Sequence, residues 1–206
     1  MPGHKIPLYN ITTPPGGTSV VELDEAKAHL QVDFSDDDTI IQFFIDTAQD
    51  LIQDYTNQLF ETQVQEGLFS NVEYSQFESL PYVTFKRFPV TDISKVEIHN
   101  GTAFITLTLT TDYLIEQREK QFPRVLFKEI ANFSDENEAY PIRITATCGY
   151  ANAAAVPNKI KMAIRMLAAE FYDNRGDCPE DSKGMFLLPK SLKRTIGSCI
   201  IREVYG

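Results

Sequence analysis

The stretch from Ser35 to Phe60, SDDDTIIQFFIDTAQDLIQDYTNQLF, has the spacing of an amphipathic helix. Its apolar residues recur every three or four positions, which places them in one stripe along a helix. Ser35 is predicted to cap this helix, with Asp38 reaching back as in a capping box. A helix of about 22 residues with a single apolar face needs another element to cover that face. The stripe comprises Ile40, Ile41, Phe44, Ala48, Leu51, Ile52, Tyr55 and Leu59.

A second stretch with the same spacing begins at Pro157 and reads PNKIKMAIRMLAAEFYDNRG. Proline is well tolerated in the first helical turn, and Arg175 with Gly176 marks the end of the helix. We expect the two apolar stripes to pack against each other, which brings distant parts of the chain together. The expected contact residues are Phe44, Ala48, Leu51 and Tyr55 in the first helix and Ile160, Ile164, Leu167 and Phe171 in the second.

The residues between these helices are rich in short β-forming runs. His99, Asn100, Gly101 and Thr102 carry the Asn-Gly pair that is typical of a hairpin turn. The predicted strands are Tyr82–Phe85, Ile93–His99, Phe104–Thr110, Tyr113–Gln117, Arg124–Lys128 and Ile142–Cys148. The predicted fold class is therefore α+β, with a helical base built from the N- and C-terminal helices and an inserted antiparallel β-domain.

This interpretation divides the chain into five parts. Residues 1–18 are Pro-rich and are expected to be an extended N-terminal arm or a disordered leader. Residues 19–60 form the first part of the helical base, which includes a short helix over Val20–Val32 with Ala26 and Leu30 on its buried side. Residues 61–150 form the β-domain, and residues 157–176 form the second helix of the base. Residues 177–206 form a loop and a basic tail with a final helix, because Leu192, Ile196 and Ile200 are spaced by four.

The composition restricts the class of protein. No apolar run reaches the roughly 18 residues that a membrane span needs, and the N-terminus lacks the apolar region of a secretion signal. The three cysteines, Cys148, Cys178 and Cys199, lack Cys-x-x-Cys spacing. This pattern favours reduced thiols in a cytoplasm over disulfides or a zinc site.

The formal charge of −10 is unevenly distributed. Residues 157–206 contain nine Lys and Arg against six Asp and Glu, a net of +3, so residues 1–156 carry −13. An acidic body disfavours general binding to a phosphate backbone. The basic final segment fits two interpretations: contact with an acidic protein or DNA, or a solvated surface without a partner.

The motifs that mark common enzymes are missing from the sequence. His4, His29 and His99 stand alone, and no base accompanies Cys148 as a nucleophile. Asp36, Asp37 and Asp38 suit a cation site in principle, but their place at a helix start favours capping. We therefore expect no enzymatic activity, no metal and no cofactor.

Aromatic residues near Lys86 and Arg87 admit two interpretations. Aromatic side chains beside cations are found at nucleic-acid surfaces. In an acidic domain, packing in a core or a subunit interface is the favoured interpretation. The aromatics concerned are Phe69, Tyr74, Phe77, Tyr82, Phe85 and Phe88.

Two stretches of the chain resemble the head–tail connector (adaptor) proteins of tailed bacteriophages. The first has a short "L-x-E-A-K-x-H-L-x-V-D" helix, an acidic turn, and a "D-x-x-I-x-x-x-I-x-x-A" helix that runs to an aromatic-Thr pair. Its matching positions are Leu23, Glu25, Ala26, Lys27, His29, Leu30, Val32, Asp33, Asp38, Ile41, Ile45, Ala48, Tyr55 and Thr56. The family's "P-V-x-x-I-x-x-V" run is similar to Pro89, Val90, Ile93 and Val96.

The second stretch resembles the family's closing signature, a strand that ends in Gly-Tyr, an Ala-rich loop and a final helix. The matching positions are Gly149, Tyr150, Val156, Pro157, Ile160, Lys161, Ala163, Ile164, Leu167, Ala169, Tyr172, Asn174 and Arg175. The two motifs in this order and at this distance extend from about Val21 to Arg175. The leader and the residues after Arg175 depart from the pattern.

The resemblance implies a structural role in a virion, at the head–tail junction of a phage, a prophage or a gene-transfer particle. Such a protein forms a homo-oligomeric ring of twelve copies beneath the portal protein and is assembled in the cytoplasm of the bacterial host. The ring extends the DNA channel, so double-stranded DNA passes without specific binding. It also docks a head-closure (stopper) or tail-completion protein.

The resemblance also suggests roles for two charged groups. The acidic side of the long helix, with Asp46, Asp50 and Asp54, is expected to face a neighbouring subunit or the channel, where an acidic wall repels phosphate. The basic tail, with Lys190, Lys193, Arg194 and Arg202, is expected to bind the portal.

Two other classes of protein remain open at this point. One is a monomeric, non-viral module that binds a small ligand or peptide in a concave aromatic pocket. The other is a hydrolase with an unrecognised site, although the sequence offers no nucleophile–base pair. The oligomeric state, alone and with portal, distinguishes the connector from the binding module.

Overall fold

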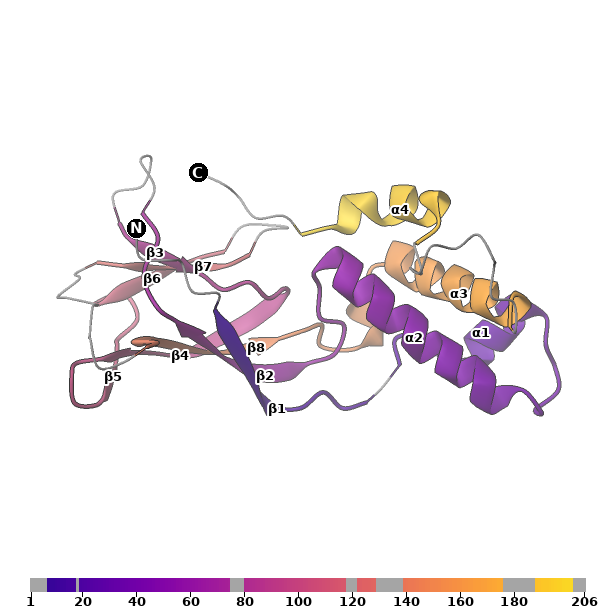
Figure 1. Ribbon diagram of the computed structural model, residues 1–206, viewed down its shortest axis with the longest axis horizontal. Coiled ribbons are helices and arrows are strands. Elements are labelled where there is room, and N and C mark those ends of the chain that lie inside the picture. Colours follow the sequence, from indigo (N-terminus) through magenta and orange to yellow (C-terminus); the bar gives the residue numbers. More distant parts are fainter. Residues whose placement is uncertain are drawn as a thin grey trace.

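The helices gather at one end of the molecule and the strands at the other, as Figure 1 shows. The computed structural model describes residues 7–17, 19–74, 80–117, 122–128, 139–175 and 188–201. Among these residues the strands pair in antiparallel sheets, and the helices come from both sides of the β-rich region in the sequence. The mixed α+β class predicted from the sequence is therefore confirmed.

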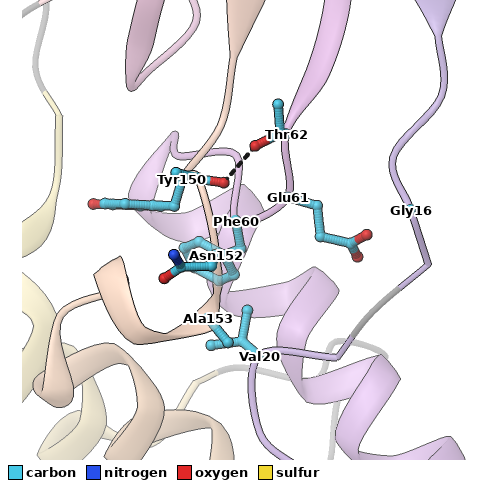
Figure 2. Close-up of a pocket in the computed structure, with 9 residues that line it drawn as sticks. Gly16, Val20, Phe60, Glu61, Thr62, Tyr150, Asn152 and Ala153 are labelled. Carbon is cyan, nitrogen blue, oxygen red and sulfur yellow. Dashed lines mark hydrogen bonds between the residues drawn. The ribbon is translucent and has the colours of Figure 1, made fainter.

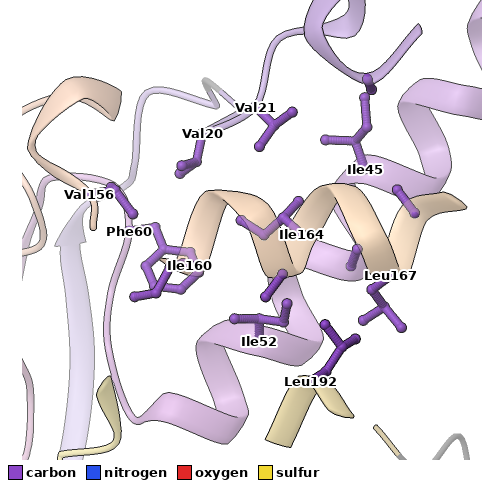
Figure 3. Packing of buried hydrophobic residues seen from close by; sticks show 14 of the residues in the cluster. Val20, Val21, Ile45, Ile52, Phe60, Val156, Ile160, Ile164, Leu167 and Leu192 are labelled. Carbon is purple, nitrogen blue, oxygen red and sulfur yellow. The ribbon is translucent and has the colours of Figure 1, made fainter. Parts of the chain in front are cut away.

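The helical end is built around two long helices, α2 (Asp38–Thr56) and α3 (Asn158–Asp173). They run in opposite directions, because the ring of Phe44 near the start of α2 lies 6.0 Å from that of Phe171 near the end of α3. Shorter elements cover this pair: α1 (Leu23–Leu30), the 3₁₀ turns η1 (Ala153–Ala155) and η2 (Gly197–Cys199), and α4 (Lys190–Ile196). The buried side chains between them form one hydrophobic cluster (Figure 3).

The predicted cap of the long helix is wrong. The helix begins at Asp38, and the residue before it, Asp37, makes no side-chain capping bond. Asp37 instead accepts hydrogen bonds from Tyr172 (2.5 Å) and Arg175 (2.7 Å), and Asp38 forms an ion pair of 2.5 Å with Lys27. These carboxylates bind partners on α1 and α3, so contacts between elements took precedence over a local cap.

The strands form two antiparallel sheets. The larger has the order β1-β2-β8-β4-β5, and the smaller has the order β3-β7-β6. The bounds of the larger sheet are β1 (Leu8–Thr13), β2 (Gln63–Phe69), β4 (Val90–His99), β5 (Phe104–Thr106) and β8 (Ile142–Cys148). Those of the smaller sheet are β3 (Tyr82–Thr84), β6 (Tyr113–Glu116) and β7 (Arg124–Phe127).

The hairpin predicted at Asn100 and Gly101 is confirmed, since β4 and β5 pair on either side of it. Two strands were not predicted. β2 pairs with β8, with Gln65 opposite Ala146, and β1 pairs with β2 at the edge of the sheet. The extended N-terminal residues are therefore part of the sheet from Leu8 to Thr13.

A second hydrophobic cluster fills the space between the two sheets. Tyr9 of β1 fastens the edge strand to it, because its ring packs edge-on against Phe69 (6.0 Å) and Phe85 (5.2 Å). The Arg87 guanidinium lies 4.0 Å from the centre of the Tyr9 ring, and the Tyr9 hydroxyl accepts a hydrogen bond from the backbone N–H of Lys86. Phe69, Tyr82 and Phe85 are buried, as the favoured interpretation expected, whereas Tyr74 is 74% exposed and Phe77 lies outside the described residues.

The two ends of the molecule meet at a tight backbone crossing. Gly149 has a φ of +98°, and a Cβ on it would lie 1.9 Å from the carbonyl oxygen of Glu61. The Glu61 carboxylate accepts a hydrogen bond from the backbone of Gly17 (2.8 Å), and Thr62 donates to the Tyr150 carbonyl (2.6 Å). Three passages of the chain between the ends are therefore bound to one another.

The described part of the C-terminal tail is docked on the helices. Leu192 and Ile196 are buried in the helical cluster, and the N–H of Ile201 donates to the carbonyl of Thr56 (3.0 Å). The final helix ends at Ile196 and is followed by η2, so the helix predicted to include Ile200 is shorter. The 3₁₀ turn lets the chain bend back toward α2. A continued helix would have directed the chain away from α2.

Candidate interaction surfaces

The outward side of α2 carries three exposed aspartates, Asp46, Asp50 and Asp54. They recur every four residues, on the side of the helix away from its buried residues Ile41, Ile45, Ala48 and Ile52. Asp46 accepts hydrogen bonds from Ser19 and Gln42, both of 2.9 Å. None of the three forms an ion pair within the described part of the chain. We call these three residues the acidic stripe.

The carboxylates of the acidic stripe repel one another. Partial burial raises the pKa of the Asp50 carboxyl above its ordinary value, and the negative charges of Asp54, Asp46 and Glu61 raise it further. A carboxylate with three like charges nearby and no cation is less favourable than one in a mixed surface. The stripe would therefore gain from a cationic partner.

Exposed apolar side chains continue this surface toward the start of α2. The Phe43 side chain is 64% exposed, and Ile40 and Phe34 are also exposed. The apolar spacing of the sequence places Phe44 in the stripe but does not include Phe43, which is next to it and turned outward. The signal was available, since an aromatic residue outside the apolar stripe of a helix is unusual on a solvated face.

The outward side of α3 carries cations and an exposed methionine. Lys159 and Met162 are exposed, and Lys161 and Arg165 are half-buried. The Nε atom of Arg165 is buried and has no hydrogen-bond partner among the described residues. The apolar spacing of this helix does not by itself mark its outward face as a candidate surface.

The cations proposed for portal binding lie on the docked helix α4. Lys190 and Arg194 are exposed, Lys193 is half-buried, and none of them forms an ion pair with a described residue. Because Leu192 and Ile196 face the helical cluster, the cations lie on the other side of α4. Arg202 lies outside the described residues.

The eight residues expected between the two long helices lie in one cluster. Ala48, Ile160, Ile164 and Leu167 are buried, and Phe44, Leu51, Tyr55 and Phe171 are partly buried against them. The cluster also takes in side chains that the sequence reading did not assign to it: Val20, Val21, Phe60, Val156, Leu192 and Ile196.

A pocket of about 350 Å³ lies where the helices meet the sheets (Figure 2). Its polar groups are mostly engaged, since Thr62 donates to Tyr150 and the Asn152 side chain accepts from the backbone of Ala155. Burial raises the pKa of Tyr150 to about 12, so its hydroxyl is not a base at neutral pH. The lining residues are Gly16, Val20, Phe60, Glu61, Thr62, Tyr150, Ala151, Asn152 and Ala153.

The groups considered for chemistry lie apart. Cys148 is buried, and burial raises the pKa of its thiol to about 12, so it stays protonated at neutral pH. His99 packs edge-on against Phe104 at 5.0 Å, and His29 is exposed on α1. His4 and Cys178 lie outside the described residues. Within the described ranges, no three His, Cys, Asp or Glu residues come together as a metal site.

None of the described helices combines the length and the apolar character that crossing a membrane would need.

Comparison with known proteins supports the resemblance seen in the sequence. Residues 20–83 match the model of the family described as phage gp6-like head-tail connector protein. These residues include α1, the acidic turn and α2. No curated protein matches the chain significantly.

Solved structures with the same fold come from gene transfer agent (GTA) particles. A chain from the neck of an empty GTA particle, computed with C6 symmetry, has a TM-score of 0.69 and 16% identity, with 97% of this chain and 98% of that chain covered. A chain from the virion of a native GTA particle has a TM-score of 0.67, and one from a native neck computed with C12 symmetry has 0.66. Both are 17% identical over 97% of this chain and 98% of theirs. The resemblance is therefore confirmed: residues 20–83 carry the pattern of the phage head-tail connector family, and the chain shares its overall fold with chains of GTA particles.

Proposed function

We propose that this protein is a structural connector at the head–tail junction of a phage or phage-like particle. The observation that carries this proposal is the connector pattern over residues 20–83, within a chain whose fold resembles neck chains over nearly its whole length. The protein would have no catalytic role, and no cofactor or metal would be needed. It would be assembled into the particle in the cytoplasm of the bacterial host.

The proposed connector is a ring of twelve copies beneath the portal protein. The support for twelve copies is that a neck with a similar chain was computed with C12 symmetry. The ring would extend the DNA channel and dock a head-closure or tail-completion protein. DNA would pass without specific binding, in keeping with a net charge of −13 over residues 1–156.

The proposed helical base, with the β-domain inserted into it, would hold these contacts in place. Its support is the cluster shared by α2 and α3, whose residues lie on either side of the β-rich part of the sequence. A rigid base is suited to a ring because every subunit must present the same two faces to its neighbours.

Light scattering of the purified protein, alone and mixed with the portal protein of the same genome, tests the proposal. We expect a complex with the mass of the portal ring plus about one connector chain for each portal chain. A chain that remains monomeric and does not bind portal rings at any concentration would contradict the connector function and favour the monomeric binding module.

We also propose that the cations of α4 contact the portal. Changing Lys190, Lys193 and Arg194 to Glu should weaken portal binding by about tenfold or more, because like charges then meet in the contact. A control variant changes two cations of the β-domain, Lys95 and Lys128, to Glu. Circular dichroism should show both variants folded. Unchanged portal binding by the α4 variant would remove these cations from the mechanism.

A further inference from the structure

The outward faces of the two long helices, α2 and α3, point in opposite directions. The buried residues of α2 and α3 face each other in the helical cluster, so residues on the far side of each helix point away from the pair in opposite directions. The acidic stripe and Phe43 lie on the far side of α2. Met162 lies on the far side of α3, and the half-buried Lys161 and Arg165 lie on the flank next to it.

The two faces have opposite charge and share an apolar element. Helix α2 contains no Lys or Arg, and its outward aspartates form no ion pair with any described residue. On the α3 side, Lys161 and Arg165 form no ion pair with a described residue, and the buried Nε of Arg165 makes no hydrogen bond within the described chain. Each face also has an exposed apolar side chain, Phe43 on α2 (64%) and Met162 on α3 (40%).

The opposite charges also lie at the same level along the helix pair. The rings of Phe44 and Phe171 are in contact, and the helices run in opposite directions. Asp50 follows Phe44 by six residues, and Arg165 precedes Phe171 by six residues. At about 1.5 Å of rise per residue, both are displaced equally from the aromatic contact. Asp54 follows Phe44 by ten residues, and Lys161 precedes Phe171 by ten residues. These two residues are therefore also level with each other.

We propose that the α2 face of one copy packs against the α3 face of the next copy, as the subunit interface of the ring. This inference rests on the proposed connector function, which requires a ring. Two different, complementary faces on one chain make a head-to-tail contact, and such contacts generate rings when the rotation closes. In the proposed ring the helix pair runs along the ring axis, and rotation about that axis keeps each residue at the same level from one copy to the next. Asp50 thereby meets Arg165 of the next copy, and Asp54 meets its Lys161.

A charge-swap experiment tests this interface. The first variant carries Asp50→Lys and Asp54→Lys, and the second carries Lys161→Glu and Arg165→Glu. Each alone brings like charges together at every interface, which should raise the concentration needed for ring assembly by about 100-fold. A variant with all four changes restores opposite charges and should form rings again. An equimolar mixture of the two double variants should also form rings, because alternating copies match at every contact in an even-numbered ring.

The control variant, Glu22→Lys with Asp24→Lys, changes the net charge as the first variant does, but at exposed residues before and in α1. It should assemble like the wild type. Assembly is measured by mass photometry and negative-stain microscopy, with the protein alone and with the portal protein of the same genome. Circular dichroism and thermal unfolding establish that each variant is folded.

The outcomes separate the interface from the function. If the wild type forms rings and the double variants form them equally well, the interface lies elsewhere while the connector function stands. If the double variants fail and neither the mixture nor the four-residue variant recovers, pairing of these faces is likewise contradicted. If the wild type forms no ring in either condition, both the proposed function and this interface are contradicted.

Discussion

At the residue scale, Gly149 is the position that tolerates least change. Its φ of +98° is strained for any other residue, and a Cβ would meet the Glu61 carbonyl oxygen at 1.9 Å. This contact gives the Gly-Tyr pair in the sequence motif a physical reason, because only glycine lets the two backbone passages approach so closely.

We therefore expect Gly149→Ala to lower the free energy of unfolding by about 2–4 kcal/mol, or to prevent folding. Denaturant unfolding measures this change. Gly197→Ala is the control, because its Cβ would meet nothing within 4 Å and its φ of −56° is helical. A Gly149 variant as stable as the Gly197 variant would show that the crossing is looser than described.

Asp50 provides a prediction that depends on pH. A carboxyl whose pKa is raised in the folded state destabilises that state when ionised, at pH values above its folded pKa. The penalty disappears below the ordinary value of 3.8, where both states are protonated. Asp50→Asn should stabilise the monomer at pH 7 by about 0.2–0.5 kcal/mol, as expected for removing like-charge helix pairs.

Thermal unfolding of the Asp50→Asn variant between pH 7 and pH 3 measures this effect, with Asp24→Asn on α1 as the control. The gain should shrink as the pH falls. A constant gain would show that the effect does not come from the ionised carboxylate, and a loss at pH 7 would show that Asp50 is compensated within the monomer. If the ring interface is correct, the same variant forms rings less well. The substitution then stabilises the monomer but weakens ring assembly.

At the element scale, the contact between α2 and α3 holds the helical end together. Ile164 is fully buried in their shared cluster. Ile164→Ala should lower the free energy of unfolding by about 2–5 kcal/mol through lost burial and the cavity left behind. Met162→Ala, at an exposed position two residues away, should change it by less than about 0.5 kcal/mol in the monomer. Equal effects in denaturant unfolding would contradict the described packing.

The elements that the sequence predicted well are those with a clear apolar period. Both long helices could be located because their stripes extend over many turns. Strand β2 was missed because its inward side holds Gln63, Gln65 and Gly67, so its residues do not alternate between apolar and polar. Strand β1 was missed because only its pairing with β2 and the packing of Tyr9 fix it in the sheet.

The candidate surfaces also divide into features that the sequence predicts and features that only the fold shows. The acidic stripe could be predicted, since its spacing of four and its separation from the apolar residues are properties of the sequence alone. The outward orientation of Phe43 and the unpartnered Nε of Arg165 depend on neighbours that only the fold supplies. The role of the helix-start carboxylates was mispredicted for this reason, because Tyr172 and Arg175 come from the other end of the chain.

At the scale of the whole molecule, the uneven charge now has a spatial meaning. The sequence showed an acidic body and a net charge of +3 after residue 156. In the structure the cations of α3 and α4 lie in the helical end, beside α2 with its uncompensated aspartates. The helical end of the molecule therefore carries charges of both signs, which suits association of identical copies better than binding to a polyanion.

The pairing of α2 with α3 also has a consequence for synthesis on the ribosome. About a hundred residues separate the end of one helix from the start of the other. At roughly 5–20 residues per second, the apolar stripe of α2 stays uncovered for about 5–20 seconds after it is made. A nascent chain in this interval exposes Ile45 and Ile52 to the cytosol and so resembles a chaperone substrate. In fragments that stop before Pro157, the apolar stripe of α2 stays exposed permanently. Such fragments are prone to aggregate.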